Sequence, residues 1–277
     1  MNDYWLAVLL GIVEGLTEFL PISSTAHLLL AEQLLNVPLK EDYWKMYTVV
    51  IQFGAILAVV VYYQSRLRDL IGDFFASNSK YPVPRWRHPV ILVLAAVVPA
   101  GLVGVLAKSR IDALMERAQP IGFALLIGGV LIEAIERWCR GRGRVRDAAD
   151  VSPGQAIGIG CAQAIALIPG SSRSACTIMG GRLLGLDMRA AADFSFLLSI
   201  PTMFAAAVYS LYKHHVPLDR HQWGVLAVGF IVSFAVAWPV VAWFLHYLKT
   251  HSFRVFVVYR VIVGLAVIIA VWRGYLD

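Results

Sequence analysis

Long runs of apolar residues, separated by short polar segments, recur along almost the whole chain. A helix needs about 17 to 25 apolar residues to cross a bilayer. Six runs have this character, and they cover residues 46–63, 90–107, 121–138, 193–212, 224–246 and 255–272. The pattern predicts an all-α polytopic membrane protein with six transmembrane helices.

Two further apolar stretches, 4–34 and 157–184, are each interrupted near the middle by proline and hydroxyl residues. The first contains EGLTEFLPISSTAH at 14–27, and the second contains PGSSRSACT at 169–177. A non-helical turn at membrane depth is tolerated only where protein or a water-filled cavity surrounds it. We therefore expect two re-entrant helix-loop-helix segments whose tips meet inside the protein.

The two interrupted stretches also resemble each other. Both carry P-x-S-S, and the residues before it are displaced by one position between the copies. Three complete spans follow each copy, so the second half is expected to be inverted relative to the first, as in an inverted-topology repeat. We expect one membrane domain over 1–277, with repeat 1 at about 1–138, repeat 2 at about 157–277 and a basic cytoplasmic loop at 139–156.

Composition and charge agree with a membrane protein. Only 15% of the residues are charged and 59% are apolar, whereas soluble domains have about 25% charged residues. Basic residues are densest in the segments 64–89 and 139–156, which the positive-inside rule places in the cytoplasm with both termini outside. The net charge of +6 suits attraction to anionic lipids, and no basic motif with interleaved aromatic residues indicates a nucleic-acid partner.

Two acidic residues lie deep in the first interrupted stretch. Glu14 and Glu18 are four positions apart and so share one face of a helix. A charged carboxylate there costs about 2.5–3.5 kcal/mol on insertion scales, which favours a functional role. Because two close carboxylates repel each other, one of them is protonated or a cation lies between them. We expect a divalent cation, Mg²⁺ or Ca²⁺, since these ions also bind phosphate oxygens.

The second interrupted stretch supplies the opposite charge. Arg173 lies in the middle of an apolar segment, and its planar group of donors matches the geometry of phosphate. Nearby hydroxyl groups are expected to bind phosphate with it: Ser23, Ser171, Ser172, Ser174 and Thr177. The structural alternative is an arginine–glutamate ion pair, which is compatible with anion binding when no ligand is present.

Ser24 and His27 are three positions apart and share a face if the segment after Pro21 is helical. Histidine can act as a base, an acid or a nucleophile, and a serine beside it is a candidate nucleophile. The alternative is a histidine that only completes the packing of an apolar segment. With Glu18 and Arg173, these two residues form the candidate catalytic set for a phosphate or diphosphate inside the membrane, which implies a lipid-linked substrate.

The motifs EGLTEFLPISSTAH and PGSSRSACT resemble the signatures of the undecaprenyl-diphosphate phosphatase family, which is known for bacitracin resistance. The resemblance covers nearly the whole chain, including IQFGAILAVVVYY at 51–63 and ADFSFLLSIP at 192–201. It implies hydrolysis of undecaprenyl diphosphate to the monophosphate carrier of cell-wall synthesis, an inverted-repeat fold and dependence on a divalent cation. By matching position, the family's functional residues fall on Glu14, Glu18, Ser24, His27, Ser172, Arg173 and Thr177. Ala26 and Ala175 stand where the family often has glycine, and both keep a small side chain.

Several alternatives stay open at this point. The nucleophile is Ser24, His27 or a water held by Glu18 and the cation, and we favour Ser24. A lipid-phosphate transporter or flippase is the second class of function, because inverted repeats with interrupted helices also occur in transporters. We expect a polyprenyl diphosphate substrate, no nucleic-acid partner, and a bacterial inner-membrane location with the active site facing the periplasm; a homodimer is a further expectation. Arg260, inside the last span, is expected to extend to the cytoplasmic interface.

Overall fold

Helices make up almost all of the regular structure. The structure, a computed structural model, describes residues 2–35, 37, 42–76, 80–81, 83–115, 118–213 and 217–276. Within these residues, six helices are long and apolar enough to cross a membrane, which confirms the predicted spans. They are α3 (Asp42–Tyr62), α5 (Pro89–Leu106), α7 (Ala118–Trp138), α10 (Met188–Lys213), α11 (Arg220–Tyr247) and α12 (Arg254–Trp272).

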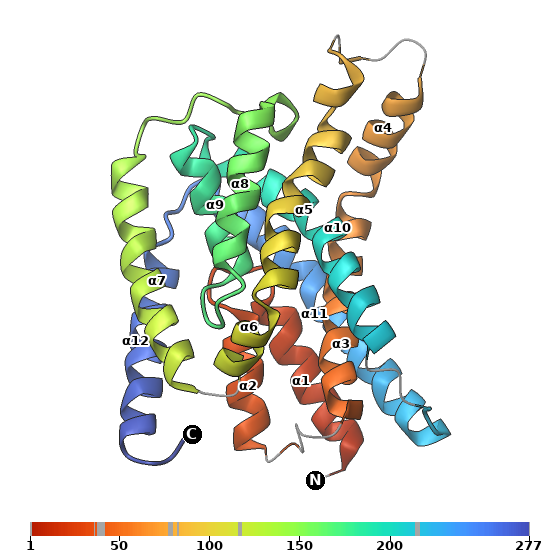
Figure 1. The fold of residues 1–277 in the computed structure, drawn as a ribbon, viewed down its shortest axis with the longest axis vertical. Coiled ribbons are helices and arrows are strands. Elements are labelled where there is room, and N and C mark those ends of the chain that lie inside the picture. Colours follow the sequence, from red (N-terminus) through yellow and green to blue (C-terminus); the bar gives the residue numbers. More distant parts are fainter. Residues whose placement is uncertain are drawn as a thin grey trace.

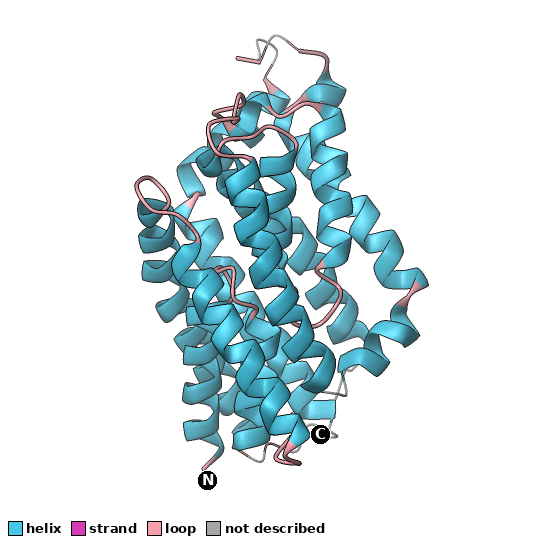
Figure 2. Cartoon of the chain, turned by 90° about the vertical axis from the view of Figure 1, so that its left-hand side faces the viewer, coloured by secondary structure: helices cyan, strands magenta, loops and turns pink. Residues whose placement is uncertain are grey.

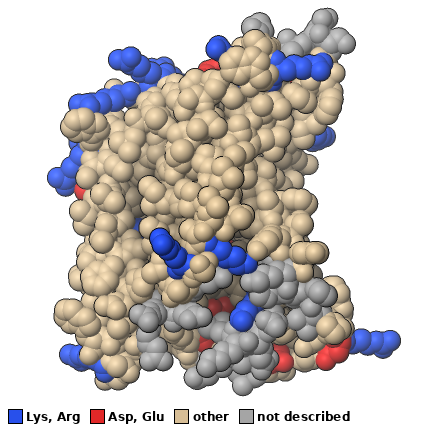
Figure 3. Space-filling model, in the orientation of Figure 1, with Lys and Arg blue, Asp and Glu red and all other residues tan. Residues whose placement is uncertain are grey.

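The outer surface of the bundle matches a membrane protein. Figure 2 shows helices that run mostly along the long axis of the molecule, with loops at its two ends. Figure 3 shows a broad zone without charged side chains across the middle of one face, with lysine and arginine side chains above and below it. Large apolar side chains on the spans remain exposed, for example Leu102, Ile127 and Ile262. An exposed apolar belt of this kind suits contact with lipid.

The two interrupted stretches form helical hairpins that approach each other from opposite ends (Figure 1). The first consists of α1 (Asp3–Thr17) and α2 (Ser24–Leu34), in the half of the molecule that contains both termini. The second consists of α8 (Pro153–Ile165) and α9 (Arg173–Leu183), in the opposite half. Re-entrant segments require this hairpin shape. Their depth in a bilayer stays a prediction.

The second helix of each hairpin begins in the same way. Ser23 and Ser172 have φ values of 71° and 72°, in the left-handed region, and each side chain caps its helix by accepting from the backbone N–H three residues later. A non-glycine residue in this region costs of the order of 1–3 kcal/mol, and such strain concentrates at functional sites. Both hairpin tips therefore maintain an unfavourable backbone geometry at the point where they meet.

These caps correct the alignment of the two copies. Ser23 and Ser172 are 149 positions apart (172 − 23), and so are Gly11 and Gly160 (160 − 11), each of which touches a backbone carbonyl of a neighbouring helix. A constant offset pairs Ser24 with Arg173. Alignment of the two P-x-S-S sequences, which pairs Ser24 with Ser172, was therefore wrong by one residue. The two consecutive serines occupy different positions of the turn in the two copies.

The two halves also pack reciprocally. Helix α1 packs on α11 through Gly11, and α8 packs on α5 through Gly160, while α7 and α12 pair with each other. A β-carbon at Gly11 would lie 2.8 Å from the carbonyl oxygen of Gly229, and one at Gly160 would lie 2.3 Å from that of Ala96. Small residues allow this close approach of helices. An inverted repeat requires such reciprocity, although the boundaries at 1–138 and 157–277 stay a prediction.

Three segments between the predicted spans contain short helices. Helix α4 (Gln64–Phe75) and the short 3-10 helix η1 (Arg85–Arg87) lie in the basic segment 64–89, and α6 (Lys108–Met115) follows α5. The basic loop 139–156 contains a second 3-10 turn, η2 (Ala148–Asp150). Helix α4 forms because Leu67 and Leu70 lie on one face and pack against the core.

Candidate functional site

The two hairpins, the three spans α3, α5 and α10, and the short helix α6 line a cavity of about 590 Å³. Its polar end is formed by the starts of α2 and α9, which contribute Ser23, Ser24, Thr25, Ser172 and Arg173, together with Glu18. Small and apolar side chains of α5 and α10 form the walls, and Lys108 and Tyr209 lie at the other end. A volume of this size is typical of a site for a small ligand. We call this space the central cavity.

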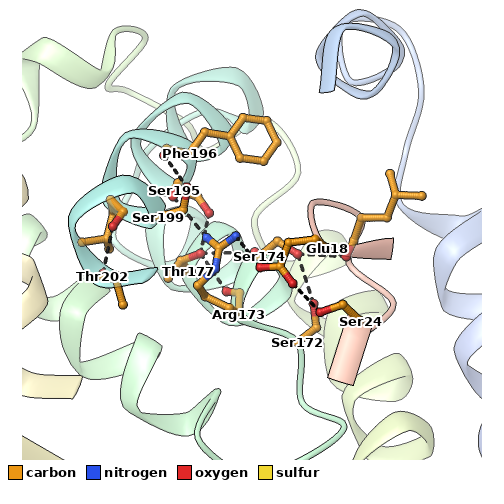
Figure 4. Close-up of polar contacts among 12 residues, drawn as sticks. Glu18, Ser24, Ser172, Arg173, Ser174, Thr177, Ser195, Phe196, Ser199 and Thr202 are labelled. Atoms are coloured by element: carbon orange, nitrogen blue, oxygen red, sulfur yellow. Dashed lines mark hydrogen bonds and ion pairs between the residues drawn. The ribbon is translucent and has the colours of Figure 1, made fainter. Parts of the chain in front are cut away.

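Glu18 joins the two hairpins across the central cavity (Figure 4). One carboxylate oxygen lies 3.3 Å from Nη2 of Arg173, and the other accepts a hydrogen bond from the hydroxyl of Ser24. Glu18 and Ser24 are nearly buried, with 8% and 7% of their surfaces exposed, yet both line the cavity. The acid of the first half, the arginine of the second and the candidate nucleophile therefore form one connected group, as the sequence predicts.

Hydroxyl groups hold the α9 start and Arg173 in place. Ser174 donates to the carbonyl of Leu20 at 2.9 Å, so it links the second hairpin to the first tip. Thr177 lies 2.6 Å from the hydroxyl of Ser195, and Nη1 of Arg173 donates to the Ser195 carbonyl at 3.4 Å. Ser174 and Thr177 do not line the cavity. Their observed contacts hold the start of α9, and direct phosphate binding by these two residues stays a prediction.

Some buried polar atoms at the site lack a hydrogen-bond partner among the described residues. Both carboxylate oxygens of Glu14 belong to this group, and Glu14 is completely buried. The Nε of Arg173 is another. A buried polar atom without a partner is costly, so such atoms need a partner that the described residues do not supply, for example a water molecule, an ion or a ligand. The unpaired atoms are carboxylate oxygens on one side and a guanidinium N–H on the other, which suit a cation and an anion respectively.

His27 does not face the central cavity. Its Nδ1 donates to the carbonyl of Ser23 at 2.7 Å, and its Nε2 accepts from the hydroxyl of Tyr259 at 2.7 Å, with the two rings stacked. The i, i+3 spacing predicts that His27 and Ser24 share a face of the helix. Their side chains point in different directions, because Ser24 turns toward Glu18 and His27 turns toward α12. Ser171 likewise lies outside the cavity lining, in the turn before α9.

Arg260 is completely buried, which overturns the expectation that it extends to the membrane interface. It donates to the carbonyls of Pro21 at 3.0 Å and Gly170 at 3.1 Å, one in each hairpin tip. Two further bonds go to the carbonyls of Ala124 and Leu125 on α7. Arginine satisfies several acceptors from one planar group. This residue therefore fastens the two tips together.

Other cavity residues carry no recognisable signal in the sequence. Gln163 and Thr202 line the wall and bond to each other at 3.2 Å, and Gln52 lies on α3. Ser195 supports Arg173 from α10 and belongs to the stretch ADFSFLLSIP. Single polar residues in apolar spans could have drawn attention to Gln52, Ser195 and Thr202, which have no fixed spacing from the two motifs, whereas Gln163 stands in the second copy where Glu14 stands in the first.

The arrangement can bind a phosphorylated ligand and act on it. Arg173 and the starts of two eleven-residue helices attract an anion, because helix N-termini carry partial positive charge. Ser24, bonded to Glu18, has its hydroxyl beside a base. The apolar walls on α5 and α10 accept the non-polar part of an amphiphile.

Comparison with known proteins agrees with this chemistry. Residues 7–266 match the family described as bacitracin resistance protein BacA. The chain is 43% identical to an undecaprenyl-diphosphatase of Koribacter versatilis (strain Ellin345), over 97% of this chain and 98% of the relative. It is 44% identical to an undecaprenyl-diphosphatase of Nitrobacter winogradskyi, over 99% of both chains, and 43% identical to one of Nitrosomonas europaea, over 98% and 96%. With a match of this extent, the chain belongs to the bacitracin resistance protein BacA family.

Proposed function

We propose that this membrane protein hydrolyses undecaprenyl diphosphate to undecaprenyl phosphate and inorganic phosphate, and so recycles the lipid carrier of cell-wall synthesis. The contact of Glu18 with both Arg173 and Ser24 at the end of a cavity with apolar walls carries the proposal. The names of the relatives describe the same activity and give no support to a lipid-phosphate transporter. Release of the carrier in this way also accounts for bacitracin resistance.

In the proposed mechanism the terminal phosphate lies beside Arg173 at the polar end of the central cavity. Ser24 attacks the terminal phosphorus while Glu18 accepts its proton, so a bond from phosphorus to the serine oxygen forms and the bridging phosphorus–oxygen bond breaks. Undecaprenyl phosphate leaves. Water then attacks the phosphoserine, which frees inorganic phosphate and restores Ser24. Arg173 stabilises the charge on the transferred phosphoryl group in both steps.

The observed bonds of His27 argue against direct attack by its ring. Nε2 is engaged with Tyr259 and Nδ1 with the Ser23 carbonyl, so neither nitrogen faces the cavity. The bond to Ser23 instead supports the strained turn that places Ser24. We therefore propose that His27 positions Ser24 and does not itself attack the substrate, so its replacement should still lower activity.

A divalent cation, Mg²⁺ or Ca²⁺, fits the acidic side of the site. Glu14 has two unpaired oxygens and lies where the charge of Glu18 acts on it, although no cluster of three potential metal ligands occurs among the described residues. Mg²⁺ is commonly held by one or two carboxylates, with water and phosphate oxygens completing its shell. Glu14 and Glu18 would hold the ion, which would neutralise charge on the diphosphate.

We expect Glu14→Gln to raise the Mg²⁺ concentration for half-maximal phosphate release by about tenfold or more, because one anionic ligand is lost while the shape is kept. The measurement is a titration of phosphate release by the purified protein after removal of bound metal with EDTA. Glu133→Gln, in an exposed ion pair with Arg137, is the matched control and should leave the titration unchanged. An identical titration for both variants would contradict a role for Glu14 in metal binding.

The spans and the basic loops support a proposal for the location and orientation of the protein. We propose that the protein lies in the bacterial inner membrane with the central cavity open to the periplasm. Labelling of Thr25→Cys in a cysteine-free background by an impermeant thiol reagent should succeed from the periplasm, and labelling of Arg142→Cys should succeed only from the cytoplasm. A homodimer stays a prediction. Measurement of the molecular mass of the purified protein in detergent tests it.

Replacement of Ser24 by alanine tests the nucleophile. We expect phosphate release from undecaprenyl diphosphate to fall by about 10³-fold or more, since the attacking oxygen is lost. Purified protein in detergent and a colorimetric phosphate assay are sufficient. The matched control is Ser23→Ala, which keeps the hydroxyl of Ser24 but removes the cap of α2. Its rate of phosphate release should fall less than that of Ser24→Ala. Activity of Ser24→Ala within a few-fold of wild type would exclude serine attack and leave a water held by Glu18.

A further inference from the structure

A second cavity, of about 280 Å³, lies toward the end of the molecule opposite the mouth of the central cavity. It is lined by the end of α3, the start of α4, the start of α10 and the end of α11. In Figure 1 these helix ends lie on the side of the hairpin tips toward α4. The lining of the central cavity instead includes Lys108 and Ile111 of α6. No part of the proposed catalytic group lines the second cavity.

Its charge is strongly basic. Arg66, Arg189 and Lys249 line it, with His246 beside them, and Asp193 is the single acidic residue of the lining among the described residues. Arginine and lysine around a cavity at the end of transmembrane helices are the usual recognition elements for anionic head groups. The cavity therefore has the composition of an anion site.

The single acid is already neutralised by other groups. One oxygen of Asp193 accepts from the hydroxyl of Tyr63 at 2.6 Å, and the other lies 3.3 Å from Nη1 of Arg66. Arg66 is also paired with Asp147 at 2.5 Å. Arg66 and Asp193 therefore neutralise each other and form one side of the cavity.

Arg189 and Lys249 form no ion pair or hydrogen bond with any side chain that the structure describes. They approach the cavity from two helices, since Arg189 lies in the first turn of α10 and Lys249 follows the end of α11. Two unpaired cations that converge on one space leave an excess of positive charge there. An anion with two or more oxygens can accept from both.

The reciprocal packing of the two halves relates the cavities. The central cavity lies between the ends of α5 and α10, where Lys108 and Tyr209 stand at its mouth. The second cavity lies between the ends of α11 and α3, with Lys249 and Tyr62 in its lining. Because α1 packs on α11 as α8 packs on α5, these are corresponding places in the two halves. Among the described residues that line the second cavity, the basic mouth is kept, no serine occurs and the one carboxylate is already paired, so the groups for binding an anion are present without those for the chemistry.

We propose that the second cavity is a non-catalytic binding site for a phosphate anion, with Arg189 and Lys249 as its primary ligands. The shared chemistry is an anionic phosphate group, supplied either by a lipid head group of the adjacent leaflet or by free inorganic phosphate. Ala242 and Leu245 line one side and give a lipid an apolar surface beside the charged group. This assignment is independent of the reaction proposed for the central cavity.

The test is a thermal-shift titration of the purified full-length protein in detergent. The three probes are dihexanoyl phosphatidic acid, dihexanoyl phosphatidylglycerol and sodium phosphate, each compared with sodium chloride at equal ionic strength. We expect Arg189→Gln with Lys249→Gln to raise the concentration for half-maximal stabilisation by about tenfold or more relative to wild type, for at least one probe. The probe that stabilises at lower concentration identifies a lipid or a free anion as the source.

The matched control is Arg140→Gln with Arg144→Gln, which removes the same charge from exposed positions outside the cavity. It should titrate as wild type does. The rate of phosphate release by the Arg189→Gln, Lys249→Gln variant should stay within about twofold of wild type. This result would show that the fold is intact and that the second cavity does not take part in the proposed catalysis. Equal titrations for wild type and cavity variant, or an equal loss in the control, would overturn the proposal. If the double variant is too unstable, Lys249→Gln alone carries the same test with a smaller shift.

Discussion

Replacing Arg173 with lysine should lower kcat for phosphate release by about 10²-fold, and replacing it with methionine by about 10³-fold or more. The guanidinium bonds to Glu18 and to the Ser195 carbonyl with its two terminal nitrogens, and its buried Nε is unpaired. Lysine preserves the charge but offers one point of contact, so it cannot keep Glu18 in place and bind a phosphoryl group together. The measurement is steady-state turnover in detergent.

The control for this substitution is Arg189→Lys, an exposed arginine in the second cavity, which should retain turnover within about twofold. A comparable loss in both variants would indicate a general effect of replacing an arginine rather than a local one. A kcat within about threefold of wild type for Arg173→Lys would show that bidentate contact is not needed, and a similar kcat for Arg173→Met would remove Arg173 from the proposed mechanism.

Replacing Arg260 with lysine should lower kcat by about 10²-fold with little change in KM, although Arg260 does not line the central cavity. Its bonds to Pro21 and Gly170 hold the two tips that carry Glu18 and Arg173. A misplacement of about 1 Å in such a group costs about 10² in rate. Lysine cannot reach both carbonyls and the two on α7, so the tips lose their common anchor.

Arg182→Lys is a close control, because Arg182 is also buried and also donates to backbone carbonyls, those of Leu186 and Cys139. Both variants should lose several degrees in Tm, since hydrogen bonds from a charged group contribute about 1.5–3 kcal/mol each. Only the Arg260 variant should lose kcat when assayed well below its Tm. Equal kcat values for the two variants would reduce Arg260 to a purely structural residue.

Local features of the sequence are sufficient for the main elements of the fold. Each of the six spans is a continuous apolar run, and the preference of such a run for lipid does not depend on the rest of the chain. The interruptions at Pro21 and Pro169 are also visible locally, because serine residues follow each proline closely, whereas Pro99, Pro201 and Pro239 lie in apolar runs and are accommodated inside α5, α10 and α11. Helix α4 was missed because its few apolar residues lie within a segment dominated by charge.

The candidate site could be predicted in part. The cost of burying Glu18 and Arg173 in apolar segments is visible in the sequence, and their opposite charges suggest that they meet. The direction of a side chain at a hairpin tip depends instead on neighbours from distant elements. His27 turns toward Tyr259, which is 232 positions away, and no spacing rule within the motif anticipates that contact.

The sequence by itself determined a six-span membrane protein with two interrupted segments, one acidic and one basic, because hydrophobic runs and insertion costs are properties of single segments. Only the tertiary structure decided that Ser24 and Arg173 occupy equivalent positions, that Arg260 fastens the tips and that a second basic cavity exists. These features arise where helices from both halves of the chain pack together. Their geometry depends on side-chain contacts across more than a hundred residues, which no local pattern encodes.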